Sequence, residues 1–209
     1  AAGKTLLYRE PPHYITLGKE LPAKALDEIL TDHAEVFTEL KEYYKQTSES
    51  DTTKISFYED TYSLYNLYRF AHYYEEAYGK YIWLKSGASL VIEHTEAMTV
   101  IDVNTGSVLK KKKQEDTLFY QINREAAKEI ARQLRLRNIS GIIMIDFINM
   151  KDTAQKEKLL SLLDSECKKD RVHCNVIDMT ALNLVEMTRS KVRKPLHEQI
   201  RSCMKNNRS

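Results

Sequence analysis

The chain has 209 residues, of which 42% are hydrophobic and 30% are charged, and its formal net charge at pH 7 is +2. This length and apolar content predict one large or two small globular domains with a real core. No apolar run approaches the roughly 20 residues of a membrane span, and the start does not resemble a signal peptide. Three cysteines, Cys167, Cys174 and Cys203, have neither zinc spacing nor an even count, so we expect a reducing cytoplasmic setting.

Charge is unevenly distributed along the chain. Residues 1–80 hold 9 Lys/Arg against 14 Asp/Glu, whereas residues 81–209 hold 23 against 16. A polyanion therefore has an electrostatic reason to approach the second part of the chain rather than the first.

The first part of the chain contains short elements separated by prolines and polar loops. The most unusual is a helix that carries tyrosine at many positions. Those rings could stack on nucleic-acid bases, although packing in a core or interface is the more usual role at helical spacing. The pattern predicts a strand near 6–10, an ambiguous strand or helix at 26–31, a helix at 36–44, a strand at 54–58, the tyrosine-rich helix at 62–78 and a strand at 81–84.

The second part alternates between strands and helices, which predicts an α/β fold with helices packed on a sheet. Two apolar runs separated by Thr95 and Glu96 are typical of an antiparallel hairpin, and a long amphipathic helix follows them. The predicted elements are strands at 89–94 and 97–103, a helix from about 116 to 137, a strand at 142–147, a helix at 155–169, a strand at 172–179 and a closing segment at 183–189.

Two of these strands each carry one aspartate near the end. The strand period of two places Asp102 and Asn104 on one face, and Asp146 shares a face with Met144 and Ile148. If the two strands are neighbours, roughly 4.8 Å apart, their carboxylates can hold one hard cation such as Mg²⁺. The simpler interpretation is that each aspartate is the first polar residue of a loop or a helix cap.

Two basic groups accompany the aspartates in sequence. The first is a run of four lysines, Lys110, Lys111, Lys112 and Lys113, and the second is a stripe of Lys128, Arg132 and Arg135 on the long helix. Either group could contact a phosphate backbone, and either could simply be a solvated face.

Several long segments closely resemble the catalytic core of the bacterial ribonuclease E/G family. They are Ser86–Glu93, Thr95–Asn104, Asn123–Arg137 and Gly141–Met150, which match in order and at the right separations. The resemblance implies a deoxyribonuclease-I-like catalytic subdomain over residues 86–209, preceded by part of a structural ribonuclease-H-like subdomain over residues 1–85. It also implies that Asp102 and Asp146 hold a catalytic Mg²⁺ and that Asn104 supports Asp102.

The chain also differs from what the family resemblance implies. An S1-type fold and a sensor of the RNA 5′-monophosphate precede such residues in full-length members, so we expect a catalytic core fragment. Members also carry a Cys-Pro-x-Cys zinc-linking segment, whereas this chain has only Cys203 in that region. A homo-oligomer is possible, but zinc-bridged dimerisation is not expected.

The sequence-based hypothesis is a Mg²⁺-dependent endoribonuclease that cleaves single-stranded RNA and leaves a 5′-phosphate and a 3′-hydroxyl. Asp102, Asp146 and Asn104 would form the catalytic site, while Lys110, Lys111, Lys112, Lys113, Arg132 and Arg135 would bind RNA. Two alternatives stay open, a non-catalytic RNA-binding scaffold and a phosphodiesterase for small nucleotides. The second would need an enclosed base pocket, of which the sequence gives no sign.

Overall fold

A computed structural model describes residues 12–20, 26–46, 54–106 and 115–206. The chain divides into two compact units, Ala1–Ala71 and His72–Ser209, and each is described by itself. Among the described residues, no helix is both long enough and apolar enough to span a bilayer. The predicted strand near residues 6–10 lies outside the described residues.

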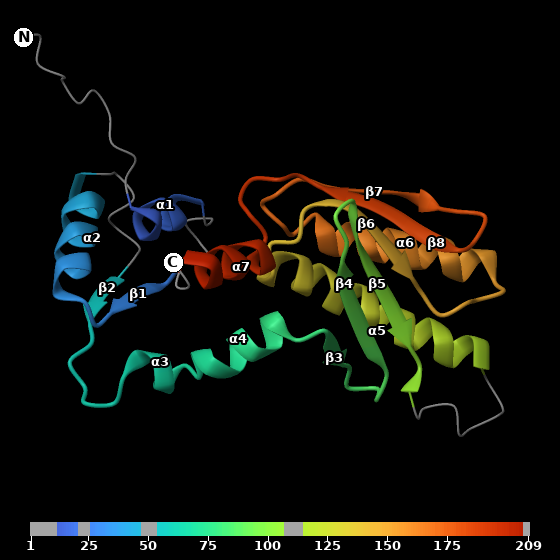
Figure 1. Cartoon of the computed structure of the whole chain (residues 1–209), viewed down its shortest axis with the longest axis horizontal. Coiled ribbons are helices and arrows are strands. Elements are labelled where there is room, and N and C mark those ends of the chain that lie inside the picture. The colour runs from blue at the N-terminus through green and yellow to red at the C-terminus, as the bar shows by residue number, and fades with distance from the viewer. Residues whose placement is uncertain (1–11, 21–25, 47–53, 107–114, 207–209) are drawn as a thin grey trace, which may run out of the picture. The chain divides into compact units, whose positions relative to one another are not determined.

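The first unit has a small core built on a pair of parallel strands (Figure 1). Glu28 pairs with Lys54 at one end of the two strands and Thr31 with Phe57 at the other, so the ambiguous segment at 26–31 forms a strand. Leu40, Tyr44 and Ile15 are buried together. The elements are α1 (His13–Glu20), β1 (Glu28–Thr31), α2 (Ala34–Gln46), β2 (Lys54–Phe57) and α3 (Leu64–Leu67).

The predicted tyrosine-rich helix is interrupted. It forms the short α3 and then α4 (Phe70–Tyr78), because Arg69 between them has a left-handed backbone with φ of 54°. Core packing is the wrong interpretation for its tyrosines, since each of them is about half exposed. Those residues are Tyr62, Tyr65, Tyr68, Tyr73, Tyr74 and Tyr78.

The second unit is a six-stranded mixed sheet with helices, which confirms the α/β prediction (Figure 1). The strand order is β3-β4-β5-β6-β8-β7, and β5 and β6 are its parallel neighbours. The predicted hairpin is confirmed by the antiparallel pairing of β4 with β5. The strands are β3 (Tyr81–Trp83), β4 (Ser89–His94), β5 (Met98–Asn104), β6 (Gly141–Asp146), β7 (Cys174–Met179) and β8 (Leu184–Arg189).

One face of this sheet is buried by α5 (Glu115–Leu136) and α6 (Thr153–Cys167). Strand residues at alternate positions point into that core, as the period of two requires. The predicted apolar side of α5 is largely buried against them. The core includes Ile101, Val103, Ile143 and Ile145 from the strands, Ile122, Ala126, Ile130 and Leu134 from α5, and Leu159 and Leu163 from α6.

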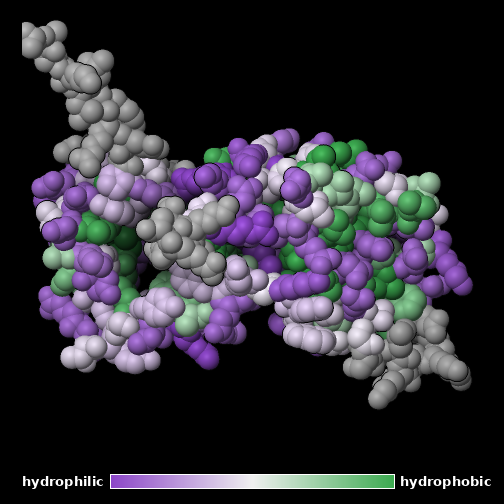
Figure 2. Space-filling model, in the orientation of Figure 1, coloured by the Kyte–Doolittle hydropathy of each residue, from purple (hydrophilic) through white to green (hydrophobic). Residues whose placement is uncertain are grey.

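The other face of the sheet is partly exposed, and we call it the exposed face. It carries Val100, Asp102, Met144 and Asp146 on the two central strands. Figure 2 shows apolar side chains, in green, reaching the surface of the second unit near β7 and β8, where Ile177 is 55% exposed.

A buried ion pair joins the end of β8 to the turn after α6. The Arg189 guanidinium lies 2.9 Å from Asp170, and the two side chains are only 3% and 4% exposed. Arg189 also donates to the side chain of Asn138 and to the carbonyl of Ile139, each at 2.9 Å. One side chain thereby fixes the loop that leads into β6.

A polar network holds α4 against α5. The Glu76 carboxylate accepts hydrogen bonds from Arg132 and, at 3.1 Å, from Gln133. Glu129 accepts from the same two side chains at 2.8 and 2.7 Å. The hydrogen bond from Arg132, opposed by burial, lowers the pKa of Glu76 below its ordinary value.

The last described helix, α7 (Leu196–Asn206), was not predicted. The Leu196 amide donates to the carbonyl of Arg137 at 2.9 Å, and the Asn138 side chain donates to the carbonyls of Arg193 and Lys194. These long-range hydrogen bonds tie the start of α7 to the end of α5. They join residues that are far apart in the chain, so the local sequence pattern does not predict them.

Asp170→Asn should lower the free energy of unfolding by about 3–5 kcal/mol, because it leaves the buried charge of Arg189 without its counter-ion. Urea denaturation followed by circular dichroism would measure this loss. The matched control is Glu198→Gln, which removes an exposed ion pair with Lys191 at 3.6 Å. That change should cost less than about 1 kcal/mol. Equal losses for the two variants would contradict the role assigned to the buried pair.

The pH dependence of stability should report the Glu76 network. Because the pKa of Glu76 is lower in the folded state, its contribution is complete above the unfolded pKa of about 4.3. The contribution is lost as the pH falls through the folded pKa. Glu76→Gln should therefore be less stable than the unmodified protein at pH 7, and the difference should shrink below about pH 4. A difference that stays constant between pH 7 and pH 3 would contradict this account.

Candidate active site

The two aspartates lie side by side on the exposed face. In the parallel pairing of β5 and β6, Asp102 is the register partner of Asp146, at the ends of the two strands. The predicted adjacency is therefore present. The residues that alternate with them, such as Ile101 and Ile145, are completely buried on the other face. Core burial thus determines which way both carboxylates point.

A third polar side chain completes this group. The Asn104 amide nitrogen donates to the Asp102 carboxylate at 2.7 Å, as the shared strand face predicts. The donated hydrogen bond holds one Asp102 oxygen in place and leaves the rest of the carboxylate available. Burial raises the pKa of Asp146 above its ordinary value, and the charge of Asp102 raises it further. Two carboxylates that repel in this way favour a cation between them.

Two turns position the end of β5. Glu125 of α5 accepts from the amides of Lys85 and Ser86, at 2.7 and 3.3 Å, and so fixes the turn before β4. Gly106 follows β5 with φ of 56°, and a Cβ there would lie 2.7 Å from the carbonyl oxygen of Gly87. Only glycine allows the two turns to approach this closely.

One buried amide positions the end of β6. Asn123 of α5 is completely buried, and its side chain donates to the carbonyl of Ile148 at 2.7 Å. The same side chain accepts from the Ile148 amide at 3.0 Å. Both hydrogen bonds act on the segment directly after Asp146, so α5 fixes the second aspartate as well as the first.

The donor atoms of this group suit a hard cation. Asp102 and Asp146 offer carboxylate oxygens, and Asn104 already orients one of them. Within the described residues, no cluster of three or more His, Cys, Asp or Glu side chains could hold a metal ion. A cation here would have two protein carboxylates, which is the number typical of Mg²⁺ sites that also use water and phosphate oxygens.

Of the basic residues predicted to bind RNA, the two that the structure describes, Arg132 and Arg135, do not lie at this site. Lys110, Lys111, Lys112 and Lys113 lie outside the described residues, between β5 and α5 in the chain. Arg132 and Arg135 lie near the C-terminal end of α5, the helix that packs on the buried face of the sheet. Glu76 and Glu129 already pair with Arg132, while Arg135 donates to the carbonyl of Glu166 at 3.4 Å. The role of Arg132 and Arg135 in RNA binding stays a prediction that these contacts do not support, and the role of the four lysines stays a prediction.

Sequence reasoning missed the residues that support the aspartates. Asn123, Glu125 and Gly106 act through contacts that are distant in the chain or depend on backbone conformation. Asn123 and Glu125 sit on the helix beside its apolar stripe, where a polar residue ordinarily faces solvent. A helix position that is polar yet close to the buried stripe was the one available signal.

Comparison with known proteins places the chain in a family. The family model described as "Ribonuclease E/G family" matches residues 1–192. The chain is 37% identical over 193 residues to a ribonuclease G of Haemophilus influenzae, covering 92% of this chain and 39% of that protein. It is 38% identical over 171 residues to ribonuclease G of Escherichia coli K12, covering 82% and 35%.

A ribonuclease E of a Nostoc species is 32% identical over 196 residues, covering 92% of this chain and 28% of that protein. The chain thus spans less than two fifths of the length of each of these three relatives. The match nevertheless includes both strands with their aspartates and almost all of the described residues. The chain belongs to the ribonuclease E/G family.

Proposed function

We propose that the chain is the catalytic part of a Mg²⁺-dependent endoribonuclease that cleaves single-stranded RNA. The observation that carries this proposal is the register pairing of Asp102 with Asp146 on the exposed face, with Asn104 bonded to the first. Such a carboxylate pair is suited to phosphodiester chemistry, and the relatives are named as ribonucleases.

In this proposal Asp102 and Asp146 hold the metal ion, and Asn104 keeps the Asp102 carboxylate in its binding orientation. Bound Mg²⁺ supplies charge stabilisation at the scissile phosphate and lowers the pKa of a coordinated water. The products would carry a 5′-phosphate and a 3′-hydroxyl. Asn123 and Glu125 act as positioning residues, because Asn123 bonds the segment after Asp146 and Glu125 bonds the turn against which the end of β5 packs.

The two structural units also suggest an assignment to the subdomains of the family. The six-stranded sheet with two helices on one face would be the deoxyribonuclease-I-like catalytic subdomain, with the smaller first unit as part of a ribonuclease-H-like subdomain. The structural units divide between Ala71 and His72, and β3 pairs with β4 inside the second unit. A family boundary after residue 85 stays a prediction.

Single-stranded RNA is the proposed substrate because the chain belongs to a ribonuclease family and because recognition of RNA sequence mostly uses bases that are not paired in a duplex. Lys110, Lys111, Lys112 and Lys113 follow Asn104 in the chain by a few residues and would supply the phosphate contacts. Oligomerisation and a role for the exposed tyrosines stay predictions.

Asp146→Asn should lower RNA cleavage by at least about 100-fold, because it removes one of the two metal-binding carboxylates and its charge stabilisation. The assay is internal cleavage of a 5′-labelled, unstructured RNA in Mg²⁺ or in EDTA. Calorimetric titration with Mg²⁺ should show weaker binding by the same variant, which separates loss of metal from loss of chemistry.

The matched control is Asp178→Asn, which removes an exposed carboxylate on the edge strand β7 of the same sheet. Cleavage by this variant should match that of the unmodified protein. RNA binding that needs no Mg²⁺ and survives Asp146→Asn, with no cleavage by either protein, would overturn the proposal in favour of a non-catalytic scaffold.

Gly106→Ala should lower both stability and cleavage. The new Cβ would meet the Gly87 carbonyl at 2.7 Å, and alanine disfavours the positive φ, so the end of β5 must shift. We expect a loss of about 1–3 kcal/mol in the free energy of unfolding. Cleavage, measured at a temperature where the variant is folded, should fall by roughly tenfold as Asn104 and Asp102 move.

Gly141→Ala separates these two effects. Gly141 also has a positive φ, of 89°, but nothing lies within 4 Å of the position that its Cβ would take. It begins β6, at the opposite end of that strand from Asp146. This variant should lose stability while keeping its cleavage rate, and a loss of cleavage as large as that of Gly106→Ala would contradict the positioning role of the turn.

A further inference from the structure

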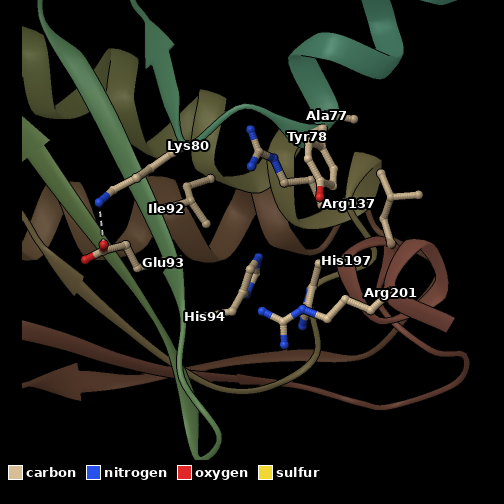
Figure 3. A pocket seen from close by; sticks show the side chains of 10 residues that line it. Ala77, Tyr78, Lys80, Ile92, Glu93, His94, Arg137, His197 and Arg201 are labelled. Carbon is tan, nitrogen blue, oxygen red and sulfur yellow. Dashed lines mark ion pairs between the residues drawn. The ribbon is translucent and has the colours of Figure 1, made fainter. Parts of the chain in front are cut away.

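A pocket of about 340 Å³ lies in the second unit between the start of α7, the end of α5 and strand β4 (Figure 3). Side chains from these three elements point toward a common space, with Tyr78 of α4 beside them. A volume of this size is in the range of small-molecule sites and is enough for a ligand as large as a mononucleotide.

Positive charge dominates the lining. Arg137 is only 4% exposed and donates to two neutral acceptors, the carbonyl of Glu76 and the side-chain oxygen of Gln133. Among the described residues no carboxylate forms an ion pair with Arg137 or with Arg201, which also lines the pocket. Burial lowers the pKa of Arg137, and the charges of Glu76 and Glu129 only partly oppose that change. Arg137 is thus a buried cation whose charge is incompletely balanced and which has no carboxylate in direct contact.

Among the described residues that line the pocket, Glu93 is the single carboxylate, and it is already neutralised. Glu93 pairs with Lys80 at 2.5 Å, and Figure 3 shows this ion pair at one side of the pocket. The remaining lining therefore presents Arg137 and Arg201 without a matching negative group. An anion entering the pocket would place a negative charge in direct contact with these guanidinium groups.

Two histidines lie between these arginines. The rings of His94 and His197 are stacked with their centroids 3.8 Å apart and their planes at 15°. The Nδ1 atom of His94 is 3.0 Å from the Thr99 hydroxyl, which leaves Nε2 as the ring nitrogen available for a ligand. Burial, followed by the charges of His197, Arg137 and Arg201, lowers the pKa of His94 to about 4.

His197 responds to the same surroundings. Burial lowers its pKa, Arg201 and Lys191 lower it further, and Glu198 opposes the change. Both rings are consequently neutral at pH 7 in the absence of a ligand. An anion would reverse the electrostatic part of this effect and let each ring take up a proton, which adds donors to the arginines.

This pocket is separate from the proposed catalytic group. Along the pairing of β4 with β5, Asp102 lies opposite Val91, whereas His94 lies opposite Thr99. That separation is three residues, or about 10 Å along the strand. His94 also alternates with the exposed-face residues and lies on the side of the sheet that α5 covers, as do the buried Leu90 and Ile92.

We propose that this pocket is a binding site for the phosphate monoester of a small molecule of nucleotide size. Arg137 and Arg201 would bind the phosphate oxygens, His94 and His197 would donate to them, and the ring of Tyr78 would lie against the rest of the ligand. A guanidinium matches the geometry of a phosphate, and the pocket is too small for a folded macromolecule.

The test is a titration of the protein with inorganic phosphate, a mononucleoside 5′-monophosphate and the same nucleoside without phosphate, followed by histidine NMR signals. Both phosphates should shift the signals of His94 and His197, assigned by His94→Gln and His197→Gln, and should raise the apparent pKa of these rings by about one pH unit or more. The nucleoside alone should leave them unchanged. Tighter binding of the nucleotide than of inorganic phosphate would show that the pocket recognises the nucleoside part as well as the phosphate. Equal binding would show that it recognises the phosphate group alone.

Arg201→Ala should weaken phosphate binding at least about tenfold, since it removes a charged hydrogen-bond donor from the exposed side of the pocket. Arg137→Lys keeps the buried charge and so protects the fold, yet should also weaken binding because it loses the planar fork. Lys158→Ala, an exposed cation on α6 outside the pocket, should bind as the unmodified protein does. The binding readout does not depend on RNA cleavage.

Two results would overturn the proposal. One is that phosphate at about 10 mM, roughly ten times the Kd of about 1 mM expected of a weak specific site, shifts neither histidine signal. The other is that an RNA oligonucleotide without terminal phosphates shifts both signals more strongly than the nucleotide does, which would make the pocket a contact for the RNA backbone.

Discussion

The parallel pairing of β5 with β6 is the constraint on which the site depends. Two parallel strands must be joined by a crossover connection, and the long helix α5 provides it. The apolar side of α5 also covers the core face of the sheet. Burial of Ile101 and Ile145 in the core fixes the register of the two strands. The next residue of each strand is an aspartate, which therefore points to the other face. The hydrophobic core and the carboxylate pair are consequently two results of the same alternation.

This arrangement sets like charges beside one another, which a fold would avoid if stability were the only requirement. Burial raises the pKa of Asp146, and repulsion from Asp102 raises it further. The repulsion is tolerated because the two carboxylates lie on the partly exposed face, while the opposite face of the sheet supplies the core. Support comes from α5, whose Asn123 bonds the backbone just after Asp146 and whose Glu125 bonds the turn before β4. A single helix thus covers the core, connects the two strands and holds the chain segments around them.

The sequence was sufficient for whatever depends on local periodicity. Alternation predicted the strands of the second unit and the shared face of Asp102 and Asn104, and the 3.6-residue period predicted α5 with its buried side. Features that depend on contacts between residues far apart in the chain could not be predicted from the sequence. Arg69 breaks the tyrosine helix with a left-handed backbone, α7 is held by hydrogen bonds from the end of α5, and the stacking of His94 on His197 joins residues about a hundred positions apart.

The two outermost strands of the sheet bear on how the protein behaves when it is concentrated. β3 has only three residues and follows Lys80, and β7 changes register between Val176 and Asp178. Edge strands that are short, charged or irregular cannot form a long run of backbone hydrogen bonds with a strand of a second molecule. Self-association through edge-to-edge strand addition is therefore discouraged at both ends of the sheet, even though Trp83 and Ile177 expose apolar surface there. The strands that carry Asp102 and Asp146 lie in the middle of the sheet, where neighbours on both sides protect their backbones from pairing with a second molecule.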